Sequence, residues 1–91
     1  MVKLYAIKDD VTERFSAPVP CVNDKQAKQQ LFTLLCQPQY QGFASSLSVY
    51  HVSDYDDVIG VIQSFGEPIL VATGVEVCEM VSKMNEVKKN G

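Results

Sequence analysis

The chain's single histidine, His51, lies in a stretch that also carries the carboxylates Asp54, Asp56 and Asp57 (VYHVSDYDDVIG, residues 49–60). Histidine and carboxylate side chains are common metal ligands and common general acids and bases. Both chemistries require several of these groups to converge on one point. The secondary structure of this stretch therefore decides whether it holds a site.

The pattern of residues 47–55 predicts a β-strand, and a strand keeps these groups apart. Successive side chains of a strand point to opposite faces, so His51 and Asp54 lie on different faces unless a bulge intervenes. Asp56 and Asp57 fall in the following turn, roughly 15 Å or more from His51 at ~3.3 Å per residue. We therefore predict an ordinary strand histidine here, with no metal site and no catalytic residue.

The acidic residues after this strand predict the turn of a β-hairpin. Aspartate favours the start of a turn, and Gly60 can adopt the left-handed conformation that closes such loops. A calcium loop would need oxygen ligands at alternating positions, and Val58 and Ile59 interrupt that spacing. The turn is therefore expected to connect two strands rather than to bind a cation.

The elements around these residues predict a single α+β domain over residues 1–91. We expect the order β-β-α-β-β-β-α, with strands at residues 3–8, 15–19, 47–55, 61–65 and 69–72. The second strand should lie at an edge or end early, because Pro18 and Pro20 cannot donate ladder hydrogen bonds. Asn23 and Gln26 predict the cap of the first helix, and Thr73-Gly74-Val75-Glu76 fits the capping box of a second. The polar residues 86–91 are expected to fray. The helices should cover one face of a mostly antiparallel sheet.

Composition indicates an ordered globular protein without a cofactor. Of the 91 residues, 46% are hydrophobic and 21% are charged. The formal net charge of −3 lowers the expectation of nucleic-acid binding, because proteins that contact phosphates usually carry a basic excess. The three cysteines are widely spaced, which predicts neither a disulfide framework nor a zinc site. No signal peptide or membrane helix is indicated, so we expect a soluble intracellular protein with no membrane partner.

Basic and aromatic residues on the first two strands indicate one candidate function, the binding of single-stranded DNA. Lys3, Lys8 and Arg14 lie on or beside strands that carry Tyr5 and Phe15. Single strands are often held by bases stacked on aromatic rings and by cations beside the phosphates. The alternative is that the two aromatic side chains belong to the core or to a sheet edge, and the acidic composition favours this alternative.

The second predicted helix indicates another candidate function, self-association as a homodimer. Val77, Val81 and Met84 belong to its apolar stripe, which either packs on the chain's own sheet or meets a partner chain. Small domains with an edge strand and an amphipathic terminal helix often dimerise.

The sequence holds no Walker pattern, no G-x-S-x-G and no nucleophile–base pair, so we predict that the protein is not an enzyme.

Several short motifs follow one another along residues 3–75. They are LYAIKD, RFSAP, Asn23-Asp24 with Ala27, SVYHVSDYD, Gly60 and Thr73-Gly74. This ordered set resembles the small non-structural protein of gokushoviruses, which are single-stranded DNA bacteriophages of the Microviridae. The resemblance implies a protein of the host cytoplasm that binds phage replication or packaging proteins and supports single-stranded genome synthesis or the switch to packaging. It supplies no catalytic residues.

Two residues of the third predicted strand depart from that family pattern. Val49 replaces the usual leucine, and Ser53 replaces a glycine. Glycine inside a strand often marks a bulge. A bulge at Ser53 would shift the alternation and place Tyr55 on the same face as Tyr50 and Val52. We therefore expect a kink in this strand.

Overall fold

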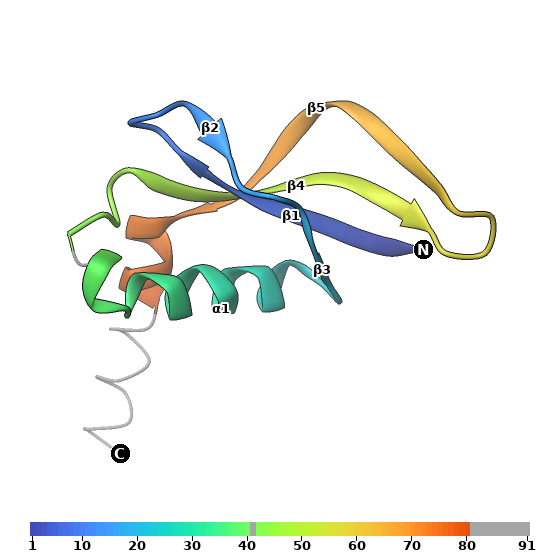
Figure 1. Ribbon diagram of the computed structural model, residues 1–91. Coiled ribbons are helices and arrows are strands. Elements are labelled where there is room, and N and C mark those ends of the chain that lie inside the picture. The colour runs from blue at the N-terminus through green and yellow to red at the C-terminus, as the bar shows by residue number, and fades with distance from the viewer. Residues whose placement is uncertain (41, 81–91) are drawn as a thin grey trace, which may run out of the picture.

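The computed structural model describes residues 1–40 and 42–80, which form a five-stranded antiparallel sheet with helices on one face (Figure 1). The strands are β1 (Val2–Asp9), β2 (Arg14–Phe15), β3 (Val19–Cys21), β4 (Leu47–Asp56) and β5 (Val61–Thr73). Across the sheet the order is β2-β1-β4-β5, and β3 pairs with the N-terminal half of β1. The predicted α+β class and the mostly antiparallel sheet are confirmed. The predicted frayed tail, residues 86–91, lies outside the described residues.

The first predicted helix is α1 (Asp24–Leu35), and its predicted cap is confirmed. The backbone N of Gln26 donates a hydrogen bond to the Asn23 side chain at 2.9 Å, which satisfies one free donor of the first turn. A short 3-10 helix, η1 (Pro38–Tyr40), follows α1. No helix within the described residues is long and apolar enough to cross a membrane. The helix packs on the sheet through its buried residues Ala27, Leu31 and Leu35.

The second helix covers residues 74–80 of the described chain, and its predicted capping box is confirmed. The backbone N of Glu76 donates to Thr73 Oγ1 at 3.2 Å, and the backbone N of Thr73 donates to a Glu76 carboxylate oxygen at 3.3 Å. Gly74 is required here because a Cβ at this position would collide with the backbone of Ala44. The helix therefore starts where the chain passes closely under the loop before β4.

The region predicted as one strand over residues 15–19 forms two short strands instead. β2 ends at Phe15, ahead of Pro18, which cannot donate a ladder hydrogen bond. Ser16 still lies beside β1: its backbone N donates to the Ile7 oxygen at 2.8 Å, and its hydroxyl accepts from the Ile7 N at 2.9 Å. The prediction that this strand lies at an edge or ends early is confirmed, because β2 ends at Phe15 and is the edge strand beside β1.

The two strands predicted at residues 61–65 and 69–72 form a single strand, β5. Gly66 has φ +83°, a conformation that lets the chain bend aside without ending the strand. Residues 65–68 stand opposite the single residue Val52 of β4, and β5 arches away there (Figure 1). The prediction of two strands was therefore wrong, and the observed order of elements is β-β-β-α-β-β-α.

The sheet has a covered face, which lies against the helices, and an open face on the other side (Figure 1). Tyr5 marks the covered face, because its hydroxyl reaches Asp24 of α1. Side chains alternate along β1, so its even-numbered residues point to the open face. The core lies between the covered face and the helices and includes Tyr5, Leu31, Val49, Ala72 and Val77.

Candidate functional site

Apolar and aromatic side chains line the open face of the sheet. The strand register shows which residues lie beside the even-numbered positions of β1. Ile62, Leu70 and Phe15 of this face are 63%, 49% and 43% exposed. Among the paired strand positions of this face, Lys8 is the one charged residue. The apolar and aromatic members are Val2, Leu4, Ala6, Phe15, Tyr50, Tyr55, Ile62 and Leu70.

The outer half of the β4–β5 hairpin carries both apolar and polar residues on each face of the sheet. This half extends beyond the end of α1 (Figure 1). On the covered-face side Asp54 pairs with Gln63, and Asp56 pairs with the half-exposed Val61. On the open side Tyr55 pairs with both Ile62 and Val2, and Ser53 pairs with Ser64. The outer half of the hairpin therefore adds the Tyr55–Ile62 pair to the open face, while both of its faces mix apolar and polar residues.

Three side chains gather at the β2 end of the open face. Lys8 Nζ lies 5.9 Å from the centre of the Phe15 ring, and that ring meets the Tyr50 ring edge-on with 5.4 Å between centroids. Lys8 Nζ also lies 3.9 Å from an Asp10 carboxylate oxygen, which compensates its charge. Sequence reasoning missed Tyr50. The strand register could have identified this residue, because it places Tyr50 opposite Ala6 and therefore on the same face of the sheet as Lys8.

The structure separates the other three predicted DNA-binding residues from this cluster. Tyr5 is 1% exposed, and its hydroxyl donates to Asp24 Oδ1 at 2.6 Å. Burial, and next this hydrogen bond, raise the pKa of Tyr5 above its ordinary value. Lys3 lies on the same side of β1 as Tyr5. Arg14 lies opposite Asp9 in the register of β1 and β2, at the sheet edge. In this arrangement a nucleic-acid base has no access to the Tyr5 ring.

His51 and Asp54 lie closer together than even alternation predicts. The register between β1 and β4 skips Val52, and this bulge brings Asp54 Oδ1 to 2.8 Å from His51 Nε2. The prediction that the two groups lie apart was wrong for this reason. The bulge falls one residue before the expected position, and it places Tyr55 on the open face with Tyr50, as predicted.

Aromatic rings enclose the His51 ring from two sides. It stacks on Tyr5 with 4.8 Å between centroids and meets Phe65 edge-on at 4.7 Å. The side chains of His51 and Asp54 are 15% and 26% exposed. Within residues 1–40 and 42–80, no three potential metal ligands gather in one place. The geometry is that of a packing contact that ties the arch of β5 to β1.

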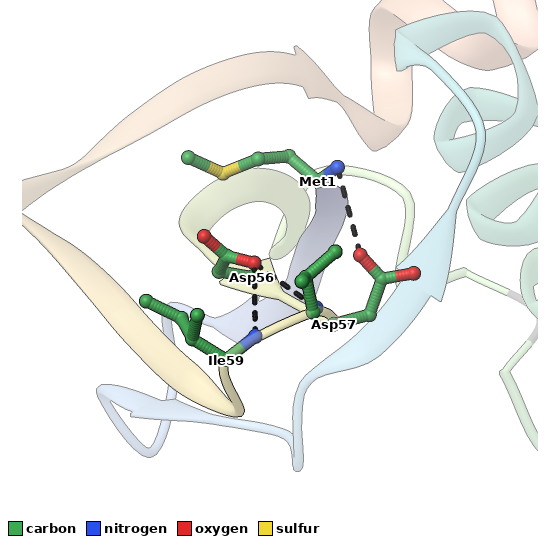
Figure 2. A network of polar contacts seen from close by, with 5 residues as sticks. Met1, Asp56, Asp57 and Ile59 are labelled. Atoms are coloured by element: carbon green, nitrogen blue, oxygen red, sulfur yellow. Dashed lines mark hydrogen bonds and ion pairs between the residues drawn. The ribbon is translucent and has the colours of Figure 1, made fainter.

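The turn between β4 and β5 holds two apolar side chains at the tip of the hairpin (Figure 2). The backbone N atoms of Val58 and Ile59 donate to Asp56 Oδ1 at 3.0 Å and 3.3 Å. Gly60 has φ +73° and closes the loop, which confirms the predicted hairpin turn. The exposed fractions of Val58 and Ile59 are 88% and 67%. The turn thus fixes the backbone while its apolar side chains face solvent.

A cleft of about 850 Å³ lies between α1 and the edge formed by β1, β2 and β3. Much of its polar lining comes from glutamines of α1, including Gln26 and Gln30. Its charged residues, Asp9 and Arg14, occupy opposite positions in the register of β1 and β2. Cys21 also lines the cleft, and burial raises the pKa of its thiol, which opposes formation of the nucleophilic thiolate. The cleft therefore does not favour cysteine chemistry.

Of the three residues predicted to mediate self-association, only Val77 lies within the described part of the second helix. Val77 is 3% exposed and belongs to the core. The other two residues predicted to mediate self-association, Val81 and Met84, lie outside the described residues. Ile62 and Leu70 of the open face and Val58 and Ile59 of the hairpin tip are among the exposed large hydrophobic residues that the structure describes.

The comparison with known proteins matches the segment that builds the sheet. A protein-family model described as "Phage ORF5 protein" matches residues 2–77. This segment runs from β1 through β5 into the second helix and includes the open face and the hairpin tip. No curated protein and no solved structure matches the chain.

Proposed function

Because this chain belongs to the phage ORF5 protein family, we propose that it is a non-enzymatic bacteriophage accessory protein that acts by binding other proteins. It acts in the host cytoplasm and supports the synthesis of single-stranded genomes or the switch to packaging. The ordered motifs that resemble gokushovirus non-structural proteins support this role. The expected partners are phage replication or packaging proteins.

The apolar tip of the β4–β5 hairpin carries this proposal. Val58 and Ile59 are largely exposed, and Asp56 holds the backbone N atoms of both residues (Figure 2). A turn that is already fixed loses little conformational entropy when it docks. Beside it the Met1 amino group lies 3.7 Å from Asp57, which partly neutralises the second carboxylate of the turn. Two rigid, branched apolar side chains suit an apolar pocket on a protein partner.

The test removes the apolar side chains of the tip and keeps its backbone. We expect the double variant Val58→Ser, Ile59→Ser to lower the ratio of single-stranded or packaged phage DNA to double-stranded phage DNA in infected cells. Asp57→Asn is the matched control, because it alters the same turn and leaves the apolar tip intact. A wild-type ratio in the double variant, at wild-type protein level, would contradict the proposal.

The cluster of Lys8, Phe15 and Tyr50 supports a second candidate function, the binding of single-stranded DNA. Two aromatic rings and a cation on a sheet face form a platform on which bases can stack. The net charge of −3 and the Asp10 carboxylate beside Lys8 weigh against this function, because phosphate contacts dominate such binding. Protein binding therefore ranks first.

Titration of labelled oligo-dT tests this second function. Phosphate-driven binding should weaken steeply between about 50 mM and about 200 mM salt. Phe15→Ala should lose about 1–3 kcal/mol of stacking energy. Phe43→Ala is the matched control, because the Phe43 side chain is 46% exposed against 43% for Phe15 and lies outside the cluster. An absence of binding at ~10 µM protein in low salt would rule this function out.

A further inference from the structure

We propose that the cleft between α1 and the edge formed by β1, β2 and β3 binds an extended, uncharged peptide segment of a partner protein. Glutamine side chains of α1 hydrogen-bond the peptide backbone, and the apolar floor takes every second side chain. The cleft of about 850 Å³ lies within the usual size of a ligand site, roughly 300–1,000 Å³. The inference uses neither the hairpin tip nor the phage role proposed above, so either proposal can fail without the other.

The side of α1 that faces the cleft carries uncharged hydrogen-bonding side chains. The polar lining residues of the helix recur at i, i+4 and i+7, which places them in one stripe along its axis. They are Gln26, Gln30 and Thr33, with Gln29 beside them and Gln37 just past the end of α1. The two lysines of α1, Lys25 and Lys28, do not line the cleft. An occupant therefore meets amides and a hydroxyl on this side rather than charges.

The spacing of these side chains matches that of an extended peptide. At ~1.5 Å of rise per residue, neighbouring members of the stripe follow one another at about 5 Å. Backbone groups that point to the same side of an extended chain recur every second residue, at about 6.6 Å, and flexible glutamine side chains absorb the difference. The distance along the helix axis from Gln26 to Gln37 is roughly 16 Å, which is the length of about five extended residues.

The glutamines have hydrogen-bonding groups to offer such a peptide. Gln26 accepts from the backbone N of Val22 at 2.6 Å through its side-chain oxygen, which leaves its Nε2 as a donor. The hydrogen bonds between described residues involve Gln26 in this way and do not use the side-chain amides of Gln29 and Gln30. Each amide offers a donor and an acceptor, as a peptide unit does.

The sheet side of the cleft does not hold a peptide by a strand ladder alone. The chain between β2 and β3 descends from the sheet edge towards the N-terminal end of α1 (Figure 1). Pro18 and Pro20 lie on this stretch, and proline has no backbone N–H to donate. A peptide backbone inside a cleft needs partners for its N–H and C=O groups. The glutamines of α1 therefore supply hydrogen bonds that this edge lacks.

The floor of the cleft is apolar. Leu47 and Val49 of β4 are buried beneath it, Ile7 and Leu34 are partly buried beside them, and Val19 is 41% exposed. Alternate side chains of an extended peptide point to one side, so those that face the floor cover these residues. Removing this apolar surface from water favours binding. The partner segment therefore carries apolar residues at alternate positions.

The charge of the cleft favours an uncharged peptide. Its charged lining residues are Asp9 and Arg14, which have opposite signs and occupy opposite positions in the register of β1 and β2. A nucleic acid would need several cations for its phosphates, and a phosphorylated or acidic peptide would need a cluster of arginines. A cleft whose lining charges cancel attracts neither of these ligands.

The test selects peptides from a displayed library of random heptapeptides, with the whole wild-type protein as bait. We expect the enriched sequences to lack charged residues and to carry apolar residues at alternate positions. The double variant Gln29→Ala, Gln30→Ala should weaken binding of the strongest peptide about tenfold or more, because it removes two hydrogen-bonding side chains. Alanine favours helix, so α1 is kept. Lys25→Ala, Lys28→Ala is the matched control on the same helix outside the cleft, and it should bind like wild type.

Circular dichroism verifies that each variant is folded. The hairpin-tip variant Val58→Ser, Ile59→Ser should bind the selected peptide like wild type, which separates this proposal from the one above. A selection that enriches no sequence overturns the proposal, and so does an enriched peptide that the glutamine double variant binds as tightly as wild type does. Binding of labelled oligo-dT that the glutamine double variant abolishes also overturns it, because the cleft would then hold nucleic acid.

Discussion

Replacing Tyr5 with phenylalanine should destabilise the fold at neutral pH but not at high pH. The Tyr5 hydroxyl donates to Asp24 Oδ1 at 2.6 Å, and the Tyr5 side chain is almost fully buried. A hydrogen bond to a charged group contributes roughly 1.5–3 kcal/mol, and the lower end applies because Asp24 is itself exposed. Tyr5→Phe should therefore lower the free energy of unfolding by about 1.5 kcal/mol near neutral pH.

The pH dependence follows from the raised pKa of Tyr5. Burial and then the hydrogen bond to Asp24 raise this pKa in the folded protein above its ordinary value of 10.0. Below about pH 10 the hydroxyl is protonated in both states, so its full contribution is present. At higher pH the unfolded chain releases the proton first, and wild type loses about 1.4 kcal/mol per pH unit. Tyr5→Phe escapes this loss, so the difference in stability should close near about pH 11.

Urea denaturation followed by circular dichroism measures this difference at each pH. Tyr55→Phe is the control, because it removes a hydroxyl from the open face rather than from the core. A difference between wild type and Tyr5→Phe that stays constant from about pH 7 to about pH 11 would refute the reasoning. The fold would then not be holding the Tyr5 hydroxyl in its protonated state.

Three further substitutions test the packing and the backbone by the same denaturation measurement. Leu31 is 0% exposed, so Leu31→Ala should cost about 2–5 kcal/mol through the cavity it leaves. Gly74→Ala should cost about 1–3 kcal/mol, because the new Cβ meets the backbone of Ala44. Gly66→Ala should cost only about 1 kcal/mol of backbone strain at φ +83°, because no atom lies within 4 Å of its Cβ position. A larger loss for Gly66→Ala than for Gly74→Ala would contradict the close contact at the second helix.

Local signals in the sequence located both helix caps and the hairpin turn correctly. Asn23, Thr73 and Gly60 each act on backbone groups within three or four residues of themselves. Such contacts form whenever the neighbouring residues take the right conformation, whatever the rest of the chain does. These features were therefore predictable from residue types and spacing alone.

Proline and glycine predicted interruptions without revealing what kind of interruption each one makes. Pro18 lies between two short strands, whereas Gly66 bends one long strand and does not end it. The outcome depends on whether β1 or β4 offers a pairing edge on the far side of the interruption. That edge comes from a distant part of the sequence, so spacing within the segment does not reveal it.

The candidate DNA-binding site shows the same limit. Strand alternation predicts that Tyr5 and Lys8 point to opposite faces of β1, because their positions differ in parity. Alternation does not tell which face the helices cover, and therefore which aromatic ring is buried. In the fold Tyr5 lies under α1, and Phe15 joins Tyr50 on the open face.

The sequence by itself determined the caps, the turn and the alternation of side chains along each strand. Only the tertiary structure decided which face lies under the helices and that Asp54 reaches His51 past the bulge at Val52. The physical reason is the range of the interactions. Caps and turns depend on hydrogen bonds between residues close in the sequence. The buried face of each strand and the position of each bulge depend on the pairing register of β1, β4 and β5, which are distant in the sequence.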